Sequence, residues 1–172
     1  MIKIGLYSGG RLADIASLRW VNVDLERSEL RYEACKTGKR VLIPLVGALR
    51  THIEALPSSD DPRAFLHPRA AASIERRNSS AGVSQQFGEL LELAGLRPLK
   101  ARRASGAGTR RSFAPLSFHS LRHTAVSLLK DAGIPQATVM ELVGHSTVEM
   151  SALYTHVGRE SLERAAAALP AL

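Results

Sequence analysis

The sequence predicts one mainly helical domain that also contains a small three-stranded antiparallel sheet, an α+β arrangement. Apolar residues recur at helical spacing in several segments, and three short segments of strand type follow one another near the N-terminal end. The chain has 172 residues, of which 45% are apolar. That length and composition suit a single domain with its own hydrophobic core.

The helices are predicted from apolar spacing together with their start and stop signals. The N-terminal one follows the turn formed by Gly9 and Gly10, so Arg11 is expected at its start. Capping signals place another after Pro135, ending at Gly144, and one more from Ser146. The helical segments are residues 11–20, 49–56, 85–96, 119–131, 135–144, a helix from 146, and 160–169.

The sheet is predicted from three segments, residues 21–23, 30–35 and 40–45. The last two are joined by a short turn, residues 36–39, that contains Lys36 and Lys39. A lysine is therefore expected at the tip of an antiparallel hairpin. Residues 57–68 form a polar, proline-punctuated connection.

Positive charge is concentrated in one part of the chain, whose net charge is +7. Eight basic residues and no acidic ones occur between Leu93 and Lys130. They are Arg97, Lys100, Arg102, Arg103, Arg110, Arg111, Arg122 and Lys130. Such a cluster is typical of a surface that binds a polyanion. Residues 100–114, where glycines and serines separate the arginines, are expected to form a flexible loop that contacts backbone phosphates.

The single cysteine, Cys35, cannot form an internal disulfide, which favours a reducing compartment. No apolar run is long enough to span a membrane, and the N-terminus has no signal-peptide pattern. We therefore expect a cytoplasmic protein without a membrane partner.

Residues His119 and Arg122 are three apart in a predicted helix, so their side chains point toward the same place. A guanidinium that grips phosphate oxygens beside an imidazole that accepts a proton suits phosphoryl transfer. His119 and His123 also have zinc-ligand spacing, but the sequence offers no third ligand, so no metal is predicted. Taken alone, Arg11 could pair with Asp14, and Lys36 could be a solvated surface lysine.

Several local motifs resemble those of the tyrosine recombinase (phage integrase) family. Residues 7–14 are similar to the family's Thr-Gly-x-Arg-x-x-Glu stretch, and residues 121–125 and 142–146 are close to its standard motifs. The family order is Arg, Lys on a hairpin, His-x-x-Arg, His or Trp, then Tyr. Six residues here follow that order, namely Arg11, Lys36, His119, Arg122, His145 and Tyr154.

The resemblance implies a role for each of these residues. Tyr154 would attack the scissile phosphate and form a 3′-phosphotyrosyl bond, without ATP, a metal or another cofactor. His119 would help accept the tyrosine proton, and Lys36 would protonate the departing 5′ oxygen. Arg11, Arg122 and His145 would stabilise the charge on phosphorus. Asp14 would be the acidic support for an arginine, and His123 would support the catalytic residues without acting on the phosphate itself. Lys39 would contact DNA together with the basic stretch.

The resemblance also implies the domain organisation and the partners. Residues 1–172 correspond to a recombinase catalytic domain that lacks the N-terminal core-binding domain and the first catalytic-domain helix. The partners would be double-stranded DNA and further copies of the chain, forming a tetramer on DNA and weak or swapped dimers without it. The protein would then be associated with the nucleoid.

Three other functions remain open from the sequence. Residues 121–144 resemble a helix-turn-helix, with Gly133 in the turn and Val139 in the core, so the chain could be a non-catalytic DNA-binding module. A decayed, inactive integrase remnant is a second possibility. A type IB topoisomerase would use similar catalytic residues, but His119 in a His-x-x-Arg motif favours the recombinase.

Overall fold

The computed structural model describes residues 1–97 and 116–144. Its helices are α1 (Ile2–Ser8), α2 (Leu12–Ala16), α3 (Gly47–Glu54), α4 (Pro68–Arg77), α5 (Ala81–Leu93), α6 (His119–Asp131) and α7 (Gln136–Val143), with a 3₁₀ turn at Trp20–Asn22. The strands are β1 (Val23–Asp24), β2 (Glu29–Glu33) and β3 (Arg40–Pro44). The predicted class, mainly helical with a small three-stranded antiparallel sheet, is confirmed.

The sheet has the order β1-β2-β3, and both pairings are antiparallel. In β2 and β3 alternate residues face the core: Leu30 pairs with Ile43, and Tyr32 pairs with Val41. The turn between the strands is closed by the Thr37 and Gly38 N–H groups, which both donate to the Ala34 carbonyl. Lys36 therefore lies at the hairpin tip, as the sequence predicts.

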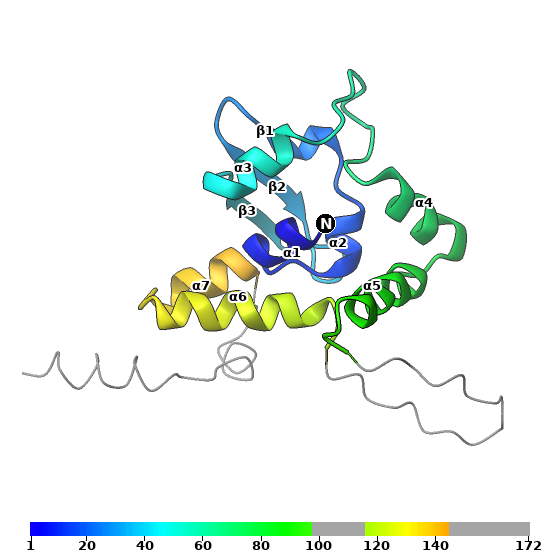
Figure 1. Ribbon diagram of the computed structural model, residues 1–172. Coiled ribbons are helices and arrows are strands. Elements are labelled where there is room, and N and C mark those ends of the chain that lie inside the picture. The colour runs from blue at the N-terminus through cyan, green and yellow to red at the C-terminus, as the bar shows by residue number, and fades with distance from the viewer. Residues whose placement is uncertain (98–115, 145–172) are drawn as a thin grey trace, which may run out of the picture.

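One hydrophobic core joins the sheet to α1, α2 and α3. Its most buried members are at most 2% exposed: Ile4, Ile15, Leu18, Leu30, Ile43, Leu45, Leu49 and Ile53. A smaller cluster of Val126, Val139 and Val143 holds α6 against α7. Figure 1 shows α6 and α7 side by side beneath α1, with α4 and α5 at the end of the molecule opposite α7.

Two glycines let these elements approach closely. A Cβ on Gly5 of α1 would lie 2.6 Å from the Phe118 ring, directly before α6. Gly9 has φ of +57°, and a Cβ there would lie 2.7 Å from Val143 of α7. The turn after α1 therefore requires glycine both for its left-handed backbone and for its packing.

Some predicted boundaries were wrong. The helix expected over residues 11–20 ends at Ala16, and a 3₁₀ turn at Trp20–Asn22 displaces the first strand to Val23–Asp24. Helices α1 and α4 were not predicted, and α5 begins at Ala81 rather than Gln85. Helix α6 has the predicted bounds, and α7 ends at Gly144 in the left-handed conformation expected there. The basic stretch 100–114 and the helices expected from Ser146 and over 160–169 lie outside the described residues.

Candidate active site

The guanidinium of Arg122 is buried at the contact between α6 and the turn that follows α1. Its side chain is 2% exposed, and Nη1 donates to the Gly9 carbonyl oxygen at 2.6 Å. These two residues are 113 positions apart in the chain. A buried guanidinium is stable only where acceptors meet it, so the Ser8–Gly10 turn fixes where this arginine points.

Arg11 leaves the same turn, two residues beyond Gly9. It has extended backbone angles and serves as the N-cap residue of α2, with its side chain half-buried. The expected position at a helix start is confirmed. Both arginines are therefore held by one short segment, Arg122 through the Gly9 carbonyl and Arg11 through the main chain.

His119 lies on the first turn of α6, one helical turn before His123. The two imidazole rings meet edge to face, with centroids 5.3 Å apart. Burial lowers the pKa of His119, and the positive charge of His123 lowers it further. Arg122 and Arg11 act in the same direction, which places His119 within electrostatic range of both arginines.

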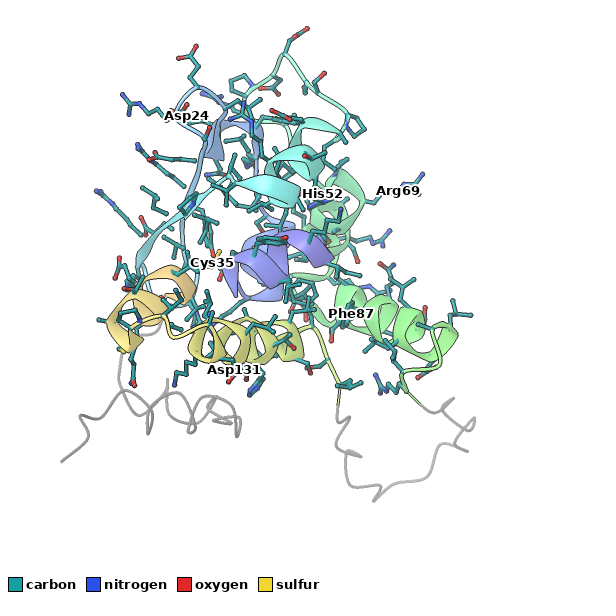
Figure 2. The ribbon with its side chains drawn as sticks, turned by 60° about the vertical axis from the view of Figure 1, so that its left-hand side comes forward. Asp24, Cys35, His52, Arg69, Phe87 and Asp131 are labelled. Carbon is teal, nitrogen blue, oxygen red and sulfur yellow. The ribbon has the colours of Figure 1, made fainter. Side chains whose placement is uncertain are left out.

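Lys36 is exposed at the hairpin tip, and the start of its turn is held by a hydrogen bond to α2. The Asp14 carboxylate, 5% exposed on α2, accepts a hydrogen bond from the Cys35 N–H with Oδ1 2.9 Å from the nitrogen. In Figure 2, Cys35 lies where the sheet approaches α6 and α7. Asp14 thus connects the arginine-bearing segment to the lysine-bearing hairpin, a contact different from the arginine support that the resemblance implies.

Lys39, on the far side of the same turn, contacts α7. Its Nζ lies 2.9 Å from Oε2 of Glu141. Gly144, at the end of α7, packs at the hairpin as well, because a Cβ there would lie 3.3 Å from Cγ2 of Val41. The hairpin is therefore joined to the helix that directly precedes His145.

The structure brings together Arg11, Asp14, His119, Arg122 and His123, with Lys36 and Lys39 on the adjoining hairpin. His145 and Tyr154 lie outside the described residues, as do Lys100, Arg102, Arg103, Arg110 and Arg111. Among residues 1–97 and 116–144, no group of three or more His, Cys, Asp or Glu side chains is arranged to hold a metal ion. Within the same residues, no helix is long and apolar enough to cross a membrane.

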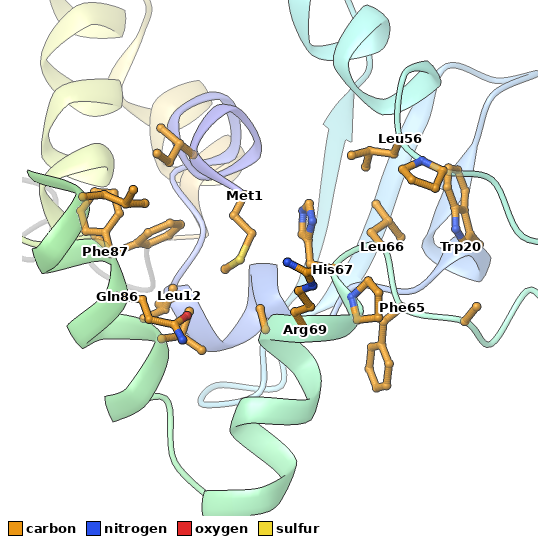
Figure 3. A pocket seen from close by; sticks show the side chains of 18 of the residues that line it. Met1, Leu12, Trp20, Leu56, Phe65, Leu66, His67, Arg69, Gln86 and Phe87 are labelled. Atoms are coloured by element: carbon orange, nitrogen blue, oxygen red, sulfur yellow. The ribbon is translucent and has the colours of Figure 1, made fainter. Parts of the chain in front are cut away.

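A cavity of about 640 Å³ is lined by residues other than those of this site. Figure 3 shows its lining, which includes Met1, Trp20, His67 and Phe87. None of the predicted catalytic residues lines it, and its walls are mainly apolar. A phosphodiester requires cationic and hydrogen-bonding groups, so the arginine cluster is the better candidate for the active site.

Sequence reasoning assigned no part in the site to Tyr32, Ser8 or Glu141. Tyr32 follows Leu30 by two residues in β2, and this alternation could have placed it on the inward face. Glu141 contacts Lys39, and Ser8 interacts with Tyr32; both pairs are distant in sequence, so local spacing gives no signal for them.

A family model described as the phage integrase family matches residues 1–161. The chain belongs to this family. It is 31% identical over 162 residues to tyrosine recombinase XerD of Ralstonia nicotianae, covering 94% of this chain and 49% of the relative. It is 30% identical over 161 residues to tyrosine recombinase XerC of Pelotomaculum thermopropionicum, covering 92% and 49%. The chain therefore spans about half the length of these curated relatives.

Solved structures show the same fold. XerA recombinase has a TM-score of 0.63 at 17% identity, with 95% of this chain and 54% of that chain covered. The catalytic domain of bacteriophage HP1 integrase has a TM-score of 0.60 at 23% identity, covering 98% and 80%. A lambda integrase dimer bound to a COC′ core site has a TM-score of 0.60 at 21% identity, covering 92% and 52%.

Proposed function

We propose that this chain is the catalytic part of a site-specific DNA recombinase, which cuts and rejoins DNA strands through a 3′-phosphotyrosyl intermediate. The main support is the convergence of Arg11, His119 and Arg122 from segments far apart in the chain. A helix-turn-helix module would need neither this convergence nor a lysine hairpin. In addition, α6 packs on α1 and α7 on β3, so these two helices are integral parts of a larger domain.

In the proposed reaction, the Tyr154 oxygen attacks the scissile phosphorus and the bond from phosphorus to the 5′ oxygen breaks. The tyrosine proton passes toward His119, and Lys36 supplies a proton to the departing 5′ oxygen. The phosphodiester energy is kept in the new bond, so rejoining requires no ATP.

The arginines have the electrostatic role. Negative charge builds on the nonbridging oxygens as phosphorus becomes five-coordinate, and Arg11, Arg122 and His145 would donate to those oxygens. Preorganised donors of this kind are each worth about 3–4 kcal/mol. Two fixed guanidiniums supply the charge that a metal ion supplies in other phosphoryl-transfer enzymes, so the scheme needs no metal.

The proposed partners are double-stranded DNA and further copies of the chain. Lys39 and the basic stretch Lys100, Arg102, Arg103, Arg110 and Arg111 would contact backbone phosphates. A tetramer is proposed on DNA, with weak or swapped dimers in its absence, and residues 160–169 would dock on a neighbouring copy. A cytoplasmic, nucleoid-associated location follows from this role.

A suicide substrate tests the proposal. On a nicked duplex the short cleaved strand diffuses away, so cleavage leaves a covalent protein–DNA band that denaturing gels resolve. We expect the band from the 172-residue chain and none from Tyr154→Phe, which keeps the ring but lacks the nucleophile. DNA binding without any adduct from the unaltered chain would favour the DNA-binding module or the inactive remnant.

A second assay separates recombinase from type IB topoisomerase. A recombinase joins strands from two different duplexes, whereas a topoisomerase relaxes supercoiled DNA without exchanging partners. Joint molecules between labelled duplexes would support the recombinase, and relaxation alone would favour the topoisomerase.

A further inference from the structure

Tyr32 of β2 reaches the turn that holds both arginines. Its hydroxyl oxygen lies 2.9 Å from the position that a Cβ on Gly10 would occupy, and Ser8 Oγ lies at the same distance from that position. Both hydroxyls therefore pack against Gly10, as does Cδ1 of Ile15, which lies 2.6 Å from the same position. Any side chain at position 10 would displace one or more of these groups.

Ser8 connects the groups at this point. Its side chain is fully buried, and Oγ donates to the Ile4 carbonyl at 2.6 Å while accepting the Gly10 N–H at 3.0 Å. A hydroxyl has one proton to donate, and that of Ser8 is used by Ile4. The Tyr32 hydroxyl interacts with this buried Ser8 hydroxyl as well.

The same turn sets the position of both guanidiniums. The carbonyl of Gly9 accepts Arg122 Nη1 at 2.6 Å, and Arg11 is the next residue after Gly10. A shift of Gly10 would thus move the acceptor of one arginine and the backbone of the other. Misplacement by about 1 Å can slow an enzyme by about 100-fold.

Tyr32 is unsuited to act as a nucleophile or a proton donor in its own right. Burial and the nearby Asp14 carboxylate raise the pKa of Tyr32 to about 12. Ser8 and the two arginines act in the opposite direction and do not cancel this effect. The phenol therefore keeps its proton at neutral pH and remains a neutral hydrogen-bond donor.

We propose that Tyr32 is a positioning residue: its hydroxyl, which packs with that of Ser8 against Gly10, locks the Ser8–Arg11 turn and thereby sets where Arg11 and Arg122 meet the phosphate. The part of this inference that concerns phosphate rests on the proposed function. The lock on the turn is a property of the folded chain and can be measured without DNA.

One variant is Tyr32→Phe, which removes only the hydroxyl, and a second is Ser8→Ala, which removes the hydroxyl beside it. Tyr7→Phe is the matched control, because Tyr7 is 40% exposed on α1 and lies outside this network. The first measurement is amide hydrogen exchange. We expect faster exchange at Gly10 in Tyr32→Phe and Ser8→Ala, and unchanged exchange in Tyr7→Phe, with thermal unfolding confirming that each variant is folded.

The second measurement is the rate of covalent adduct formation on two nicked duplexes. One has an ordinary scissile phosphate, and the other has a methylphosphonate there, which removes the negative charge that the arginines would neutralise. We expect Tyr32→Phe to be slower than the unaltered chain by about 10- to 100-fold on the phosphate. On the methylphosphonate the two rates should agree within about twofold, because the charge that the arginines neutralise has been removed.

Each outcome decides one point. Unchanged Gly10 exchange in Tyr32→Phe overturns the lock, and an unchanged adduct rate on the phosphate overturns the positioning role. Equal slowing on both substrates also overturns it, because Tyr32 would then act on another part of the reaction. If the unaltered chain forms no adduct on either duplex, the proposed function fails, and the exchange data still decide whether Tyr32 locks the turn.

Discussion

Asp14 accepts a hydrogen bond from the backbone N–H of Cys35, the residue immediately before Lys36, with Oδ1 2.9 Å from the nitrogen. The carboxylate is buried on α2, which begins at Leu12, directly after Arg11. One side chain therefore links the helix that follows an arginine to the hairpin that carries the lysine. If this link is the main role of Asp14, an oxygen acceptor is needed there and a negative charge is secondary.

The first prediction follows from that distinction. Asp14→Ala removes the acceptor of a partly buried hydrogen bond from the Cys35 N–H and should lower the free energy of unfolding by about 1–3 kcal/mol. Asp14→Asn keeps an amide oxygen and should lose clearly less. Urea denaturation measures both. Equal losses would indicate that the charge itself is needed, as expected if Asp14 mainly supports an arginine.

The second prediction concerns the ion pair between Lys39 and Glu141. Glu141 is 74% exposed, so the pair should contribute less than about 1 kcal/mol and Glu141→Gln should barely change the unfolding temperature. Because the variant frees Lys39 for a phosphate, it should bind every duplex more tightly, with a salt dependence steeper by about 0.9 log units. Salt titrations of DNA binding measure this change.

Glu54→Gln is the control for the loss of one negative charge, because Glu54 pairs with Arg50 on α3 in another exposed ion pair. It should leave the salt dependence of DNA binding unchanged. If both variants steepen it equally, net charge explains the effect and Lys39 makes no specific DNA contact.

The third prediction is a loss of stability in acid caused by His67. Burial, together with the positive N-terminal amine and His52, lowers the pKa of His67 to about 4. The unfolded chain binds this proton with a pKa near 6.5. The stabilisation of the fold by neutral His67 is therefore complete above about pH 6.5 and is lost as pH falls through about 4.

His67→Phe should flatten the fall in unfolding free energy between pH 6.5 and 4, since phenylalanine suits the apolar cavity in Figure 3 and does not titrate. One proton gives at most about 1.4 kcal/mol per pH unit, and partial exposure keeps the slope below that limit. His52, whose pKa is also lowered, leaves a residual slope. An unchanged slope in His67→Phe would contradict the assignment.

The sequence predicted elements where local signals agreed with each other. Helix α6 combines apolar spacing with a glycine after its end, and its bounds matched. Helix α1 was missed because Gly5 lies within it and Gly9 and Gly10 follow, and glycine is normally unfavourable in helices. In the fold, Gly5 permits close contact with Phe118, a benefit that depends on a partner more than one hundred residues away.

For the site, the resemblance supplied the residue types, while the structure supplied the contacts. No spacing rule connects Arg122 to the Gly9 carbonyl, Asp14 to the Cys35 N–H, or Lys39 to Glu141. These contacts depend on how the hairpin, the turn and the two helices pack. The supporting network was therefore invisible until those elements were placed in space.

The fourth prediction is a shift in the acid limb of the pH–rate profile for DNA cleavage. If neutral His119 accepts the Tyr154 proton, the adduct rate should rise with pH through the pKa of His119, which burial and then His123 hold below its usual value. His123→Asn removes one positive neighbour and should move this limb to higher pH. Single-turnover rates between pH 5 and 8 measure it, with His52→Asn on α3 as a control that should leave the limb in place.

The fifth prediction separates the role of Lys36 from that of Arg122. An alkoxide is a poor leaving group and needs an acid, whereas a sulfur in the 5′ bridging position leaves readily as a thiolate, because thiols have a pKa near about 8.5. Lys36→Ala should therefore cut ordinary DNA slowly and recover on the sulfur substrate. Arg122→Ala should not recover, since the charge on the nonbridging oxygens still lacks its partner.

Lys39→Ala is the control for loss of a hairpin lysine, because Lys39 lies on the same turn but is paired with Glu141. Lys39→Ala should weaken DNA binding, and the 5′-sulfur substrate should not preferentially restore its adduct yield. Adduct yields at saturating DNA separate binding from chemistry. If the sulfur substrate restored Lys36→Ala and Arg122→Ala equally, or neither of them, Lys36 would not be the general acid. The hairpin would then serve to position DNA, with Lys36 and Lys39 acting together on its backbone.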